Sequence, residues 1–233
     1  MSWNSEEEFV KSFLSSTGFM SRSIKNDYEV WTEVKTGFGR PDIVIVEYNS
    51  NVLEERRGCD QKLLTAPLST KTAFALSYLS TCRWVRRENL GKFLNVKRAQ
   101  LNSVVQELQA RGLIEVKDHL IKLKPKSEIL AVNRVRVFEA KLTQWMDAIE
   151  QAERHLWFTN DSYILMPEVE GKRATSITHE CDKRGIGLSF FNEVTGYSAV
   201  VKPAQSGVQN SPMLWQINEK LVGGAREREP IFS

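Results

Sequence analysis

Two apolar, strand-like segments that carry acidic residues constrain the fold of this chain most, and they lie far apart in the sequence. They are GRPDIVIVE at residues 39–47 and VRVFEAKL at residues 135–142. Side chains alternate between the two faces of a strand, so Glu139 and Lys141 share one face and Phe138 points to the other. A carboxylate from each strand together with one ammonium group is a minimal site for holding a divalent cation against a phosphodiester.

Composition describes an ordinary globular chain. Its 233 residues have room for one large domain or two small ones, and 41% of them are hydrophobic and 26% charged. No apolar run approaches the ~20 residues that a membrane span needs. The first eight residues are acidic and without the apolar core of a signal peptide. The three cysteines show no CxxC spacing. We therefore expect a cytoplasmic protein with no membrane partner.

Charge is distributed unevenly along the chain. Residues 66–126 contain 12 Lys and Arg against 4 Asp and Glu, whereas the whole chain has a net charge of only +3. A basic segment within an otherwise acidic chain indicates a module that binds a polyanion. The alternative is a solvated face with surplus lysines.

Periodicity predicts alternating helices and strands on both sides of this basic segment. The expected helices are residues 5–16, 142–158 and 175–184, and a further helix is indicated near 212–222. The expected strands are residues 28–35, 41–47, 134–141, 163–166, 185–191 and 197–201. Residues 49–65 are polar and contain turn-forming Asn and Gly, which predicts irregular structure.

The basic segment has its own pattern. Helices are expected at residues 69–80, 86–94 and 96–111, with a tight break at Asn95 between the last two. An alternating run at residues 113–123 predicts a hairpin that turns at Asp118-His119. Three helices followed by a hairpin resemble a winged helix-turn-helix domain, and the resemblance covers roughly residues 68–125.

The outer segments resemble the PD-(D/E)XK nuclease superfamily, with Pro41-Asp42 and Glu139-Ala140-Lys141 as the matching residues. The resemblance implies an α/β, restriction-endonuclease-like fold with a mixed central sheet flanked by helices. The two motifs usually lie closer in sequence, and a winged-helix insertion accounts for their separation here. The expected domains are a discontinuous nuclease-like domain, an inserted winged helix-turn-helix domain and a polar C-terminal tail. Their ranges are 1–48 with 132–203, 66–126, and 204–233.

The resemblance also implies a site. Asp42, Glu139 and the main-chain carbonyl of Ala140 would bind one or two Mg²⁺ ions, with Mn²⁺ as a substitute, and Lys141 would position water or neutralise transition-state charge. The alternative is that Asp42 merely begins a strand and that Glu139 and Lys141 are solvated. Carboxylates beside strongly apolar runs are costly unless they are used, which favours the site.

Two further residues are candidates for this site. Many members of the superfamily add an acid from the first helix, and Glu6 is nearest the middle of the apolar stripe of that helix; alternatively, it complements the helix dipole. Some members carry a Gln-x-x-x-Tyr motif on the helix after the lysine. This chain has Gln151 there but His155 in place of the tyrosine, so Gln151 is a candidate and His155 is interpreted as a boundary histidine.

The third helix of the basic segment offers polar side chains away from its apolar stripe, as a helix that reads the major groove does. The second helix and the hairpin add cations that would bind phosphates. The candidate DNA-binding residues are Arg86, Arg87, Lys92, Lys97, Arg98, Gln100, Asn102, Ser103, Gln106, Lys117, Lys122 and Lys124. Such domains also dock proteins, but the surplus of cations favours nucleic acid.

The sequence therefore predicts a Mg²⁺-dependent DNA endonuclease in which the inserted domain binds DNA. A homodimer would supply the two sites that cutting both strands needs. The alternative is a catalytically inactive nuclease-fold protein that acts as a DNA-binding or regulatory factor, and a third hypothesis is a module that binds RNA or protein. Retention of the Asp, Glu and Lys favours the enzyme over the inactive protein.

Overall fold

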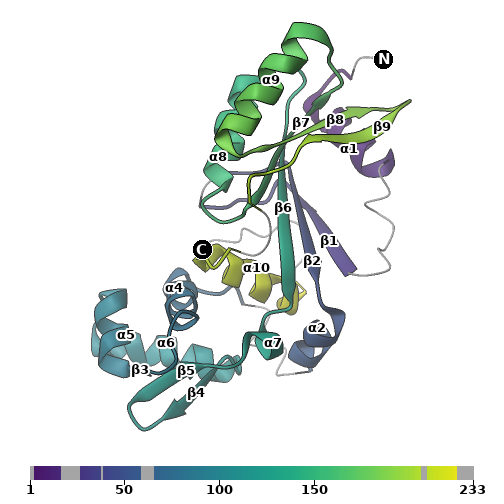
Figure 1. Ribbon diagram of the computed structural model, residues 1–233. Helices are drawn as coiled ribbons and strands as arrows, with labels where there is room; N and C mark the ends of the chain where they lie inside the picture. The colour runs from purple at the N-terminus through teal and green to yellow at the C-terminus, as the bar shows by residue number, and fades with distance from the viewer. Residues whose placement is uncertain (1–2, 17–26, 38, 59–65, 206–208, 225–233) are drawn as a thin grey trace. The chain divides into compact units, whose positions relative to one another are not determined.

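A computed structural model describes residues 3–16, 27–37, 39–58, 66–205 and 209–224 of the chain (Figure 1). The chain divides into two compact units, each built from two separate stretches of sequence. The first comprises residues 1–47 and 133–209, and the second comprises residues 48–132 and 210–233. None of the helices in the described part of the chain has the length and apolar character that a membrane span requires.

The first unit is an α/β structure around a six-stranded sheet with the strand order β1-β2-β6-β7-β8-β9. The strands are β1 (Asp27–Thr32), β2 (Ile43–Tyr48), β6 (Val132–Ala140), β7 (Asp161–Pro167), β8 (Gly187–Asn192) and β9 (Gly196–Val201). β6 and β7 pair in parallel, as do β7 and β8, whereas β8 and β9 are antiparallel. The expected mixed sheet flanked by helices is thus confirmed at the level of the α/β class.

Helices cover both faces of this sheet (Figure 1). On one face, α1 (Glu6–Ser16) buries Phe9 and Phe13 against Ile43, Ile45 and Phe138. On the other face, α8 (Trp145–His155) and α9 (Gly171–Arg184) pack over the alternate residues of β7 and β8. Successive side chains of a strand point to opposite faces, so Asp42, just before β2, and Glu139 of β6 do not share the face that packs against α1.

The first strand is shorter than the expected residues 28–35. It ends at Thr32 because Glu33 has a positive φ of 53°, which a pleated strand does not accommodate. Glu33 is held in this turn by Arg40, whose Nε donates to the Glu33 carbonyl oxygen at 3.0 Å and whose Nη2 lies 2.7 Å from Glu33 Oε2.

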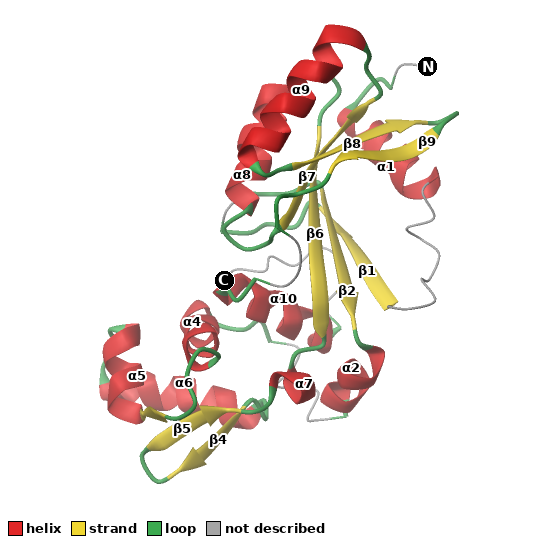
Figure 2. Cartoon of the chain, viewed as in Figure 1, coloured by secondary structure: helices red, strands yellow, loops and turns green. Residues whose placement is uncertain are grey.

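The second unit contains several helices and a small sheet (Figure 2). Its elements are α2 (Ser50–Arg57), α4 (Thr70–Leu79), β3 (Val85–Arg86), α5 (Arg87–Leu94), α6 (Arg98–Ala110), β4 (Ile114–Lys117), β5 (Leu120–Leu123), α7 (Lys126–Ile129) and α10 (Pro212–Gly223). The predicted hairpin is confirmed: Lys117 pairs with Leu120, so Asp118 and His119 form the turn. The predicted break is also confirmed, because Asn95 ends α5 in the left-handed conformation with a φ of 49°.

The prediction of irregular structure for residues 49–65 was wrong over part of its range, because Ser50–Arg57 form α2. Asn49 is not a turn former here, because its Oδ1 accepts hydrogen bonds from the backbone N–H groups of Asn51 and Val52. It is therefore a helix N-cap, a role that asparagine fills as readily as a turn. Residues 59–65 lie outside the described residues.

Residues 209–224 also differ from the polar tail expected at 204–233, and residues 206–208 and 225–233 of that tail lie outside the described residues. The helix indicated near residues 212–222 is present as α10, and nine of its residues are buried, including Trp215 in the core of the second unit. Ser211 begins it by accepting a hydrogen bond from the N–H of Leu214, and Pro212 follows in the first turn, where its missing donor costs nothing. Glu219 of this helix receives Arg56 and Arg111 in a buried ionic cluster.

Candidate functional site

Asp42 and Ala140 are joined directly. One carboxylate oxygen of Asp42, Oδ2, accepts a hydrogen bond of 2.7 Å from the backbone N–H of Ala140. The two residues belong to segments almost a hundred positions apart, and they meet because β2 and β6 are neighbours in the sheet. The structure thus brings together the two segments from which a site was expected.

Glu139 lies beside Asp42 and is almost fully buried, with 4% of the residue exposed. Burial, and then the negative charge and hydrogen bond of Asp42, raise the pKa of Glu139 to about 8. Burial also raises the pKa of Asp42. Two buried carboxyl groups this close together retain a proton near neutral pH, because their negative charges repel. A bound cation would offset that repulsion.

Lys141 and Glu6 form an ion pair at the edge of this carboxyl pair, with Lys141 Nζ 2.8 Å from Glu6 Oε2. Burial lowers the pKa of Lys141, but the hydrogen bond and charge of Glu6 and the charges of Asp42 and Glu139 outweigh it, so the pKa is raised overall. The ammonium group therefore stays charged. Glu6 comes from the first turn of α1, so the four side chains come from three separate segments of the chain.

His155 is buried against Glu139, which corrects its interpretation as a boundary histidine. Its residue exposure is 1%, and its Nε2 is 3.3 Å from Glu139 Oε1. Burial, and then the charge of Arg154, lower the pKa of His155 to about 4, so the imidazole is neutral near pH 7. The sequence did contain a signal: His155 is one helical turn beyond Gln151 on the row beside the buried stripe of the helix.

Gln151 is less closely associated with the site than was expected. It is half-buried on α8. Its side chain forms no hydrogen bond with Asp42, Glu139 or Lys141 among the described residues, so it stays a candidate on its position in the helix alone.

The donor set at this position suits a hard cation. Asp42 and Glu139 offer carboxylate oxygens, which Mg²⁺ and Mn²⁺ prefer as ligands. Ala140, whose main-chain carbonyl is the third expected ligand, is the last residue of β6. No group of three or more His, Cys, Asp or Glu side chains with the geometry of a metal site occurs within the described ranges. The fit therefore rests on the two carboxyl groups, whose ionised forms are disfavoured by burial until a cation offsets their charge.

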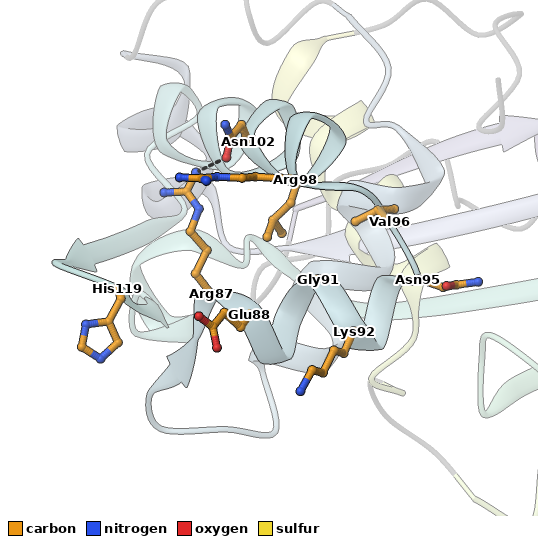
Figure 3. A pocket seen from close by; sticks show the side chains of 10 residues that line it. Arg87, Glu88, Gly91, Lys92, Asn95, Val96, Arg98, Asn102 and His119 are labelled. Carbon is orange, nitrogen blue, oxygen red and sulfur yellow. Dashed lines mark hydrogen bonds between the residues drawn. The ribbon is translucent and has the colours of Figure 1, made fainter.

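A cavity of about 810 Å³ opens between α5 and α6 in the second unit (Figure 3). The candidate DNA-binding residues Arg87, Lys92, Arg98 and Asn102 line it, and Glu88 and His119 also contribute. Arg87 reaches across from α5 to α6, where its Nη2 donates to Asn102 Oδ1 at 3.0 Å (Figure 3). The cavity therefore gathers three cations beside one carboxylate.

The other candidate DNA-binding residues occupy different surroundings. Those that are exposed are Arg86, Lys97, Gln100, Ser103, Gln106 and Lys117. Lys122 and Lys124, on and just beyond β5, are half-buried. Lys122 has partners of its own, because its Nζ is 3.8 Å from Glu115 Oε2 and 5.6 Å from the ring centroid of Trp84.

Comparisons with known proteins add no further residues to this site. No family model matches the chain, and neither the curated proteins nor the solved structures contain a match to it. Function is therefore inferred from the residues themselves and from their contacts.

Proposed function

We propose that this protein is a metal-dependent DNA endonuclease of the PD-(D/E)XK type. The observation that carries the proposal is the convergence of Asp42, Glu139, Lys141 and Glu6 from the start of β2, the end of β6 and α1. Two carboxyl groups and one ammonium group meet where the motif resemblance expects them. A buried carboxyl pair of this kind is costly to a fold, which supports a role for it in binding a cation.

Asp42 and Glu139 would hold Mg²⁺ through carboxylate oxygens, with the main-chain carbonyl of Ala140 as a further ligand. When bound, such an ion would supply positive charge near the scissile phosphate and would lower the pKa of a bound water. Lys141 donates to the attacking water or to a non-bridging phosphate oxygen, where negative charge grows in the transition state. Hydrolysis adds the water oxygen to phosphorus and breaks one P–O bond, and the leaving oxygen takes a proton.

The second unit would bind the DNA. The order of α4, β3, α5, α6, β4 and β5 and the pairing of β3 with β5 support the winged-helix interpretation. The exposed polar side chains of α6 and the cations around the α5–α6 cavity are suited to base edges and phosphates, respectively. This binding would give affinity and orientation, whereas the first unit would supply hydrolysis.

The test is cleavage of linear duplex, circular duplex and single-stranded DNA with Mg²⁺, with Mn²⁺ or with EDTA. The wild type is compared with Asp42→Asn, Glu139→Gln and Lys141→Met. We expect metal-dependent cutting that each substitution lowers by about 100-fold or more. Lys35→Met, which removes an exposed cation of the first unit, is the control and should cut at the wild-type rate.

Glu6→Gln and Glu7→Gln form a matched pair within the first turn of α1. Glu6 contacts Lys141, whereas Glu7 pairs with Lys11 on the exposed side of the helix. Loss of cutting in Glu6→Gln alone would support Glu6 as a member of the site. Metal-independent DNA binding without any cutting would contradict the proposed nuclease activity. It would favour the alternative of an inactive, DNA-binding protein.

A further inference from the structure

His155 is held rigidly at the end of α8. Its backbone carbonyl accepts hydrogen bonds from the N–H groups of Phe158 (3.0 Å) and Thr159 (3.1 Å). Thr159 in turn donates through Oγ1 to the carbonyl of Val135 on β6, at 2.6 Å. The end of the helix is therefore tied to the strand that carries Glu139, and the imidazole is buried beside that strand.

The imidazole has one polar partner within the described part of the chain. Nε2 is 3.3 Å from Glu139 Oε1, and the two side chains are 1% and 5% exposed. The other ring nitrogen, Nδ1, is buried without a hydrogen-bond partner there. Nε2 is therefore the ring nitrogen within reach of a carboxylate oxygen, whereas a proton on Nδ1 would be a buried donor without a partner.

The same edge of the ring also faces the loop that leads to Asp42. A Cβ atom placed on Gly39 would lie 3.6 Å from His155 Nε2, so only a space of about one methyl group separates the imidazole from this loop. His155 thus lies close to both segments that carry the metal-binding motif. A residue in this place can set the distance and orientation between the two carboxyl groups.

We propose that His155 is a positioning residue of the metal site: its Nε2–H holds one oxygen of Glu139 so that the other oxygen faces Asp42. The inference rests on the proposed function, because it assumes that these carboxyl groups bind a metal ion. His155 itself touches neither the metal nor the substrate. Groups that orient a ligand in this way commonly change metal affinity by about 10–100-fold when they are removed.

The test compares His155→Gln, His155→Asn and His155→Phe in the full chain. The amide nitrogen of glutamine can occupy the position of Nε2, whereas that of asparagine corresponds to Nδ1, and phenylalanine keeps the ring without a donor. Mn²⁺ affinity is measured by calorimetry without DNA, and kcat and KM are measured for DNA cleavage. His179→Gln, an exposed histidine on α9, is the control.

We expect Mn²⁺ binding to weaken by about 10-fold or more in the Asn and Phe variants and to stay near the wild-type value in the Gln variant. KM for DNA should be unchanged at saturating metal. Equal losses in all three variants, or none in any, would overturn the proposal. If the Phe variant fails to fold, the Gln and Asn pair still decides.

The same measurements distinguish a failure of the proposed nuclease function from a failure of the inference about His155. Mn²⁺ binding that follows the expected pattern without any DNA cleavage would retain His155 as a positioning residue and reject the nuclease. A wild-type protein that binds no Mn²⁺ would overturn both.

Discussion

At the scale of single residues, the carboxyl pair is the feature with the clearest consequence. Glu139 has a pKa of about 8 in the folded chain, against 4.5 as its ordinary value, so the folded protein keeps a proton that the unfolded chain releases. His155 behaves in the opposite sense, because its pKa is about 4 against 6.5. The two groups therefore oppose one another between pH 4.5 and 6.5, and only Glu139 acts above this range.

The first prediction concerns pH and stability. Without metal, we expect the free energy of unfolding to fall from pH 6.5 to pH 8 by up to about 1.4 kcal/mol per pH unit, because folded Glu139 resists ionisation. The urea midpoint at the two pH values, measured in EDTA, checks this. Glu139→Gln should reduce the change of unfolding free energy with pH. An unchanged slope in that variant would show that Glu139 is not its source.

Much of this residue-scale chemistry could be predicted from the sequence, and part of it could not. Strand alternation put Glu139 and Lys141 on one face, the motif resemblance named Asp42 and Glu139 as candidates, and helical spacing singled out Glu6 from its neighbours. The contact of His155 with Glu139 was missed, because spacing shows that a side chain lies beside the buried stripe but not which residue it contacts there. That depends on the strand beneath the helix.

At the scale of elements, local signals predicted most helices and strands, and the error at α2 came from a residue type with two roles. Asn95 and Asp118 adopt positive φ where a break and a turn were expected, which asparagine and aspartate tolerate better than most residues. Asn49 carries the same signal in the sequence, yet it caps α2. One residue type serves turns and helix starts, and the packing of the following residues decides between them.

The second prediction tests this cap. Asn49→Ala removes the acceptor of the first-turn N–H groups of α2 and should destabilise the chain by about 1 kcal/mol. Asn51→Ala is the control, because Asn51 is exposed within the helix and its side chain caps nothing. Thermal unfolding followed by circular dichroism checks both, and equal shifts in the two variants would refute the capping role.

At the scale of the whole molecule, the chain leaves the sheet after β2 and returns at β6, its neighbour in the strand order. The intervening residues fold into the core of the second unit together with α10. An insertion between adjacent strands has ends that are already close, so it costs the host sheet little. This arrangement allows a basic module to be part of a chain whose remainder is acidic.

The third prediction concerns the charge of that module. Replacing Arg87, Lys92 and Arg98 together by Gln should weaken DNA binding and lower the slope of log affinity against log salt by about one for each phosphate that is no longer bound. The control replaces the exposed Lys172, Lys183 and Lys202 of the first unit. Fluorescence anisotropy over a range of salt concentrations checks both. An equal fall in the control would show that net charge, rather than the α5–α6 cavity, governs binding.

Periodicity and turn chemistry in the sequence indicated where most elements lie and that Glu139 and Lys141 share one face, since both depend on neighbours a few residues away. Only the tertiary structure decided that β2 lies beside β6, that His155 contacts Glu139, and that α10 belongs to the core of the second unit. Strand order and the partner of an apolar helix face depend on burial between distant segments. No short window of sequence contains that information.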